Sequence, residues 1–150
     1  MPVTGRDGNV RLEQSSACRY YRLMAAYITS GWRPDVQLPG SEDFELSAVA
    51  WLLDVLPPDC RAHPVLSKYP AALALMARHY SLSSLEGARR GYRAARGELG
   101  EAVPPHAVDA LLGAYRTEGF RLRDTARAVA AVERALRGGS PAREARQGPR

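Results

Sequence analysis

Lysine is almost missing from this 150-residue chain, because 20 of its 21 basic side chains are arginines and Lys68 is the only lysine. Long hydrophobic runs are missing too. No stretch approaches the roughly 18 unbroken apolar residues of a membrane span, so a membrane-spanning protein is excluded. Hydrophobic residues still make up 45% of the chain, which excludes a wholly disordered protein. A soluble domain of this length can bury a core without cross-links.

Cysteine is scarce as well, since Cys18 and Cys60 are the only two in the chain. Two cysteines so far apart exclude a disulfide-rich scaffold and indicate free thiols in a reducing compartment. The first residues, Met1 to Gly8, contain no apolar segment of the kind found in a secretory signal peptide. We therefore expect a cytoplasmic protein.

Basic residues are absent from one central segment: residues 35–60 hold six acidic side chains and no basic one, for a net charge of −6. Residues 61–100 carry seven basic and two acidic side chains, for +5. The net charge of the whole chain, +5 at pH 7, would suit a nucleic-acid partner, but the arginine bias and abundant alanine also fit GC-rich coding. The opposed segments suggest that the charges neutralise one another within the fold or across a dimer.

The two ends of the chain differ in composition from its centre. Residues 1–9 and 138–150 are polar segments that contain glycine, and we expect both to be flexible, the second as a basic tail. Residues 10–137 are expected to form a single helical domain, because their apolar side chains recur at helical spacing and no alternating pattern predicts a strand.

Four helices are predicted within this domain. The first covers residues 11–30 and has an aromatic inner face, and the second covers 42–56 with Ser41 as its N-cap. Two long helices follow, over 70–99 and 105–137, and the short loop between them predicts antiparallel neighbours. The predicted fold class is all-α, a four-helix or irregular helical bundle dominated by a long antiparallel helical hairpin.

One face of the first long helix carries only small side chains. Its members are Ser84, Gly87, Ala88, Gly91 and Ala95. Glycine inside a helix costs roughly 1 kcal/mol relative to alanine, so a close helix crossing would be a reason to keep Gly87 and Gly91. The alternative is that the helix breaks near residues 81–87.

The last helix has the clearest pattern in the chain, a seam of positions spaced alternately by four and three residues. Its apolar members are Val108, Leu112, Tyr115, Leu122, Ala126, Val129 and Leu136. Gly119 and Glu133 interrupt the seam. We expect the packing to fray near Glu133, whose carboxylate would pair with Arg137 one turn on. The alternative is that Glu133 meets an arginine of a neighbouring helix and sets the register.

Arginines form a stripe along the first long helix. They are Arg78, Arg89, Arg93 and Arg96. Neither Arg93 nor Arg96 has an acidic residue three or four positions away, which would leave both free to bind a phosphate or another anionic partner. The acidic segment 35–60 is the alternative partner for these arginines.

No catalytic, cofactor or metal site is predicted. Cys60 and His63 have the spacing of half a zinc site, but the chain has no second pair of such ligands. It also has no phosphate-binding GxxxxGK loop, no GxGxxG turn and no GxSxG elbow.

The sequence therefore favours a non-enzymatic helical interaction or regulatory protein that binds a protein partner, or dimerises, through its hairpin. Two alternatives stay open. One is a small nucleic-acid-binding protein that uses the arginine stripe and the basic tail. The other is an enzyme with a pocket inside the helical bundle.

Overall fold

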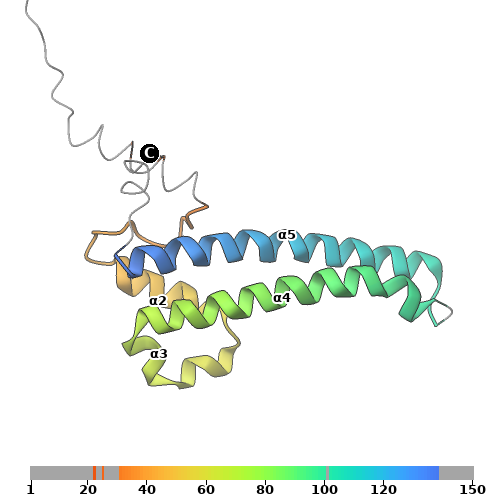
Figure 1. Ribbon diagram of the computed structural model, residues 1–150, viewed down its shortest axis with the longest axis horizontal. Helices are drawn as coiled ribbons and strands as arrows, with labels where there is room; N and C mark the ends of the chain where they lie inside the picture. Colours follow the sequence, from red (N-terminus) through yellow and green to blue (C-terminus); the bar gives the residue numbers. More distant parts are fainter. Residues whose placement is uncertain (1–21, 23–24, 26–30, 101, 139–150) are drawn as a thin grey trace, which may run out of the picture.

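The structure is a computed structural model that describes residues 22, 25, 31–100 and 102–138. Over these residues the elements are, in chain order, α2 (Phe44–Val55), the 3-10 helix η1 (Pro58–Ala62), α3 (Pro64–Lys68), α4 (Pro70–Leu99) and α5 (Pro105–Leu136). Figure 1 shows α4 and α5 side by side as a long antiparallel hairpin, with α2 and α3 packed near one end of it. The predicted all-α bundle dominated by a helical hairpin is confirmed.

Some of the sequence predictions concern residues that lie outside the described part of the chain. The predicted helix over 11–30 is one of them, apart from Arg22 and Ala25, which are both helical. The predicted flexible segments 1–9 and 138–150 also lie outside it, with the exception of Gly138.

The start of α2 differs from the prediction because Ser41 does not cap the helix. Asp43 occupies the N-cap position and makes no side-chain hydrogen bond to the helix. The hydroxyl of Ser41 instead donates a hydrogen bond of 2.9 Å to the carbonyl of Leu38. The prediction of Ser41 as N-cap is wrong, because the helix begins at Phe44 and Ser41 belongs to the turn that precedes it.

α4 is unbroken over its 30 residues, so the alternative of a break near residues 81–87 is wrong. Pro70 suits its first turn, where a missing N–H leaves no hydrogen bond unmade. In the middle of the helix the buried hydroxyl of Ser81 donates a 2.7 Å hydrogen bond to the carbonyl of Ala77. A serine that satisfies its hydroxyl in this way does not need to leave the helix.

The core is thickest where α2 packs on the hairpin, and we call this end the proximal half. Its fully buried large side chains include Leu52 of α2, Leu73 of α4 and Val129 and Val132 of α5. The distal half begins near Leu85 and extends to the loop that joins the long helices. There α4 and α5 pack against each other through two smaller clusters, centred on Leu85, Ala88 and Leu122 and on Ala95, Val108 and Leu112.

Every position of the α5 seam is buried or half-buried, including the two that interrupt its apolar pattern. Glu133 is only 7% exposed, so the predicted fraying is wrong. Its Oε1 lies 2.9 Å from a guanidinium nitrogen of Arg137, and its Oε2 lies 2.8 Å from Nε of Arg78 on α4, although at an angle outside hydrogen-bond geometry. One buried carboxylate thus makes both the predicted local pair and the alternative contact with the neighbouring helix.

Close approach accounts for one of the two glycines on the small-residue face. A Cβ at Gly91 would lie 2.5 Å from Cζ of Tyr115, because the tyrosine ring of α5 packs directly on the bare backbone of α4. A Cβ at Gly87 would meet nothing within 4 Å. The expected close crossing at Gly87 is therefore wrong, and the tight contact consists of a single aromatic ring.

Candidate functional site

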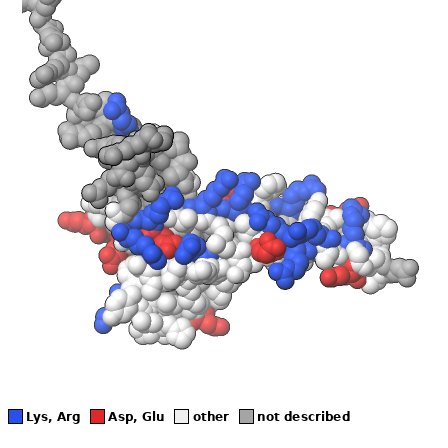
Figure 2. Space-filling view, viewed as in Figure 1, with Lys and Arg blue, Asp and Glu red and all other residues white. Residues whose placement is uncertain are grey.

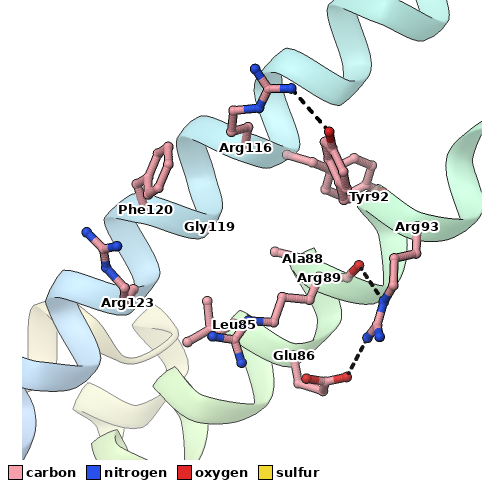
Figure 3. Close-up of a pocket in the computed structure, with 11 residues that line it drawn as sticks. Leu85, Glu86, Ala88, Arg89, Tyr92, Arg93, Arg116, Gly119, Phe120 and Arg123 are labelled. Carbon is pink, nitrogen blue, oxygen red and sulfur yellow. Dashed lines mark hydrogen bonds and ion pairs between the residues drawn. The ribbon is translucent and has the colours of Figure 1, made fainter.

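A groove lies between α4 and α5 in the distal half, where these two helices alone supply its lining residues. It encloses about 750 Å³. Its floor is apolar and aromatic and consists of Leu85, Ala88, Tyr92, Tyr115, Gly119 and Phe120. Its rim is charged and consists of Arg89, Arg93, Arg116, Arg123 and Glu86. Figure 3 shows these side chains around the open space, and we call the site the arginine groove.

Gly119 helps to make the groove possible. It occupies a seam position of α5, where the other members project side chains toward the neighbouring helix, and it is half-buried. A Cβ at this position would meet no atom within 4 Å. The missing side chain therefore leaves open space where a larger seam residue would have filled it.

Tyr92 and Arg116 form a bridge across the groove, from α4 to α5. A guanidinium nitrogen of Arg116 donates a 3.1 Å hydrogen bond to the hydroxyl of Tyr92, and the cation lies 5.8 Å from the centre of the tyrosine ring. This hydrogen bond raises the pKa of Arg116 above its usual value. The bridge fixes one end of the groove and leaves the arginine charged at every accessible pH.

Phe120 is the most exposed aromatic side chain of the groove, with 53% of its surface open to solvent. The guanidinium of Arg123 lies 5.2 Å from the centre of its ring and also contacts the carboxylate of Asp124 at 3.1 Å. Phe120 and Arg123 thus place an exposed apolar ring and a cation side by side at the edge of the groove.

The predicted arginine stripe is largely neutralised by carboxylates on the hairpin itself. Besides the contact of Arg78 described above, Arg96 pairs with Asp109 of α5 at 2.8 Å and Arg93 pairs with Glu86 at 3.2 Å. The expectation that Arg93 and Arg96 are free is wrong. Asp109 lies on the other helix, and Glu86 is seven residues away, two turns along the same face.

Arg89 is the one member of the stripe whose side chain makes neither an ion pair nor a hydrogen bond in the described part of the chain. It points into the same groove as the arginines that α5 contributes (Figure 3). The structure thus divides the predicted stripe, since Arg89 and Arg93 line the groove while Arg78 and Arg96 lie outside it.

The acidic segment 35–60 does not supply the partners of these arginines. Asp35 pairs with Arg33 at 2.5 Å, and Asp54 pairs with Arg61, so both carboxylates are used locally. The remaining acids at the start of α2 are exposed and make no ion pair within the described residues. They are Glu42, Asp43 and Glu45.

A second hollow, of about 570 Å³, lies between the end of α2 and the two long helices. Each charged side chain that lines it is already engaged, as in the pair between Glu118 and Arg121, whose atoms approach to 2.5 Å. This hydrogen bond lowers the pKa of Glu118 and raises that of Arg121. The second hollow therefore offers a ligand no free charge, in contrast to the arginine groove.

The residues considered for metal binding are not brought together. Cys60 is a buried free thiol, whereas His63, His79 and His106 are exposed. Across the described residues there is no cluster of three or more His, Cys, Asp or Glu side chains that could hold a metal ion. No described helix combines the length and the apolar character needed to cross a membrane.

The sequence prediction missed Tyr92, Arg116, Phe120 and Arg123 as members of one site. The available signal was the glycine that interrupts the α5 seam, together with arginines seven residues apart on the same helix. Comparison with known proteins gives no match to the chain among protein-family models, curated proteins or solved structures.

Proposed function

We propose that the chain is a non-enzymatic interaction protein that binds a segment of a partner protein in the arginine groove. The observation that carries this proposal is the composition of the groove, an apolar and aromatic floor, of which Tyr92 and Phe120 are exposed, beside four arginines and a single glutamate. Aromatic residues and arginine dominate the energetically important positions of protein interfaces.

The chemistry of the groove favours an acidic amphipathic helix as the bound segment. Its apolar face would pack on Phe120 and Tyr92, and its carboxylates would meet the guanidinium groups of Arg89 and Arg123. Arg89 is the strongest candidate for such a contact, because no described carboxylate already pairs with it.

Nucleic acid is a weaker candidate for the same surface. Figure 2 shows arginines spread along the visible face of the hairpin, but with acidic side chains interspersed among them. Three of the four arginines predicted to bind phosphate already contact carboxylates, at Glu133, Glu86 and Asp109. A phosphate backbone would also make little use of an apolar floor, whereas a protein segment would bury it.

The test is a fluorescence anisotropy titration of the full chain with three labelled probes. These are a synthetic helical peptide with glutamates on one face and leucines on the other, the same peptide with lysines in place of the glutamates, and a single-stranded oligothymidylate. We expect only the first peptide to bind, and neither the lysine peptide nor the oligothymidylate. Phe120→Ser and Arg89→Glu should each weaken it by about 10-fold, the effect of removing one important contact of roughly 1.4 kcal/mol.

The matched control is Arg134→Glu, a charge reversal of an exposed α5 arginine that does not line the groove. It should leave the affinity for the peptide unchanged. If oligothymidylate binds and Arg89→Glu abolishes that binding, the nucleic-acid alternative replaces the proposal. If the acidic peptide does not bind at chain concentrations at which the chain is monomeric, the proposal fails. A regulatory role in the cytoplasm is part of this proposal, on the sequence grounds given above.

A further inference from the structure

Besides the arginine groove, the outer face of α2 is a surface that no other described helix covers. This helix is mainly apolar, with the sequence FELSAVAWLLDV, and its only polar residues are Glu45, Ser47 and Asp54. Its inner face packs in the proximal core through Ala48 and Leu52, which are fully buried. On the outer side Leu46 is 73% exposed, the largest fraction among the exposed large hydrophobic side chains described, whereas the half-buried Leu53 packs against the core.

Acidic side chains lie beside the exposed Leu46 at the start of α2. Glu42, Asp43 and Glu45 are exposed, and none of them makes an ion pair within the described residues. Together they carry three negative charges, while the arginine groove carries four positive charges and one negative charge. The start of α2 thus presents three carboxylates beside one exposed leucine, which is the combination of charge and apolar surface that the groove favours.

α2 cannot reach the groove of its own chain. Leu73 of α4 belongs to the core that holds α2, and Arg89 lies 16 residues further along the same unbroken helix. At about 1.5 Å per residue the separation is roughly 24 Å. An α2 that stays packed in the proximal core is therefore available only to the groove of another molecule.

We propose that the start of α2 in one copy of the chain docks into the arginine groove of a second copy. This inference rests on the proposed function, since it names the segment that the groove binds. Leu46 packs on the floor beside Phe120, and Glu42 and Glu45 face the guanidinium groups of Arg89 and Arg123. The bound helix is already folded in each copy, so the complex loses little conformational entropy when it forms. Each copy carries one groove and one α2, and a closed pair satisfies both contacts.

The experiment is a charge exchange between the two surfaces, followed by light scattering of the full chain at tens of micromolar. The groove variant is Arg89→Glu with Arg123→Glu, and the helix variant is Glu42→Arg with Glu45→Arg. All four positions lie on the surface, and far-UV circular dichroism checks that each variant folds. The wild-type chain should be a dimer that weakens as salt is raised. Each variant alone should be a monomer, because like charges then face one another.

The decisive sample is an equimolar mixture of the two variants. In a mixed pair the acidic groove meets the basic helix, and the unchanged groove meets the unchanged helix, so the mixture should regain the mass of a dimer. The control Arg134→Glu should remain dimeric on its own. A wild-type chain that is monomeric would overturn the inference, as would dimers that persist in both variants, or a mixture that stays monomeric.

These outcomes are separate from a failure of the proposed function. The wild-type chain can be monomeric and still bind the acidic peptide through Arg89 and Phe120. In that case the groove binds a different protein, and only the inference about the second copy is wrong. A chain that neither self-associates nor binds the peptide loses both.

Discussion

The carboxylate of Glu133 should contribute more to stability than any exposed ion pair of the hairpin. It is 7% exposed and contacts Arg78 of α4 and Arg137 of its own helix. Glu133→Gln keeps the shape of the side chain and removes the charge. The Nε atom of Arg78 is itself buried, so the substitution leaves a guanidinium without its countercharge.

The size of the effect lies between two limits. Breaking a fully buried pair costs about 3–5 kcal/mol, and breaking an exposed one costs about 0–1 kcal/mol. The side chains of Arg78 and Arg137 are 37% and 54% exposed, so water can partly replace the lost carboxylate for both arginines. We therefore expect Glu133→Gln to lower the free energy of unfolding by about 2 kcal/mol, and the Tm of a chain of this size by about 4–8 °C.

The assay is urea denaturation followed by far-UV circular dichroism, with a double-mutant cycle that adds Arg78→Met. A coupling energy of about 1 kcal/mol between Glu133 and Arg78 would show that the contact between the two helices contributes to stability. Arg137→Met should cost less than Arg78→Met, because Arg137 is the more exposed partner. A cost for Glu133→Gln below about 0.5 kcal/mol would refute the reasoning, since it would mean that the carboxylate is solvated in the folded state.

Three further predictions concern the same hairpin. Gly87→Ala should stabilise the fold by up to about 1 kcal/mol, because the added Cβ would meet no other atom. Gly91→Ala should destabilise the fold by about 1 kcal/mol, because the added Cβ would overlap the ring of Tyr115. Urea denaturation should give changes of opposite sign in the free energy of unfolding for the two variants, and changes of the same sign would refute the prediction. Leu122→Ala should cost about 2–5 kcal/mol by the same assay, and a loss below about 0.5 kcal/mol would place this residue outside the core. Glu118→Gln tests a pH dependence: the lowered pKa of Glu118 means that its ion pair stabilises the fold at neutral pH, and this stabilisation is lost as the pH falls through the folded-state pKa. The free energy of unfolding of the wild type should therefore exceed that of the variant by at most about 0.5 kcal/mol at pH 7, since the pair is largely exposed, and the difference should diminish as the pH is lowered through the acidic range; a difference that stays constant would contradict the assignment.

The fold could be predicted because its signals are local. The spacing of apolar residues along α5, the proline at the start of α4 and the short loop between the two helices each depend on a few neighbouring positions. The Ser41 cap was predicted wrongly because α2 begins at Phe44, which places Ser41 in the turn before the helix, where its hydroxyl donates to the carbonyl of Leu38.

The partners of the arginines could not be predicted, because they depend on the register between helices. Arg96 meets Asp109 only because α4 and α5 are antiparallel with one particular offset, and Arg78 meets Glu133 through the same offset. Periodicity along one helix shows which face is apolar, but it does not show which residues of two helices lie opposite each other. The four arginines of the groove come together for this reason, although no segment of the sequence contains all of them.

Gly119 links the stability of the hairpin to its proposed function. A glycine within a helix costs roughly 1 kcal/mol relative to alanine. At Gly91 the ring of Tyr115 occupies the space and offsets that cost, but at Gly119 no atom would contact an added Cβ. Gly87 is similarly open, yet it is exposed and does not line the groove, whereas Gly119 is half-buried at a seam position. Packing within the chain therefore does not account for Gly119. A second molecule that fills the space beside Phe120 would account for it, because the hollow left by the missing side chain is then part of the interface.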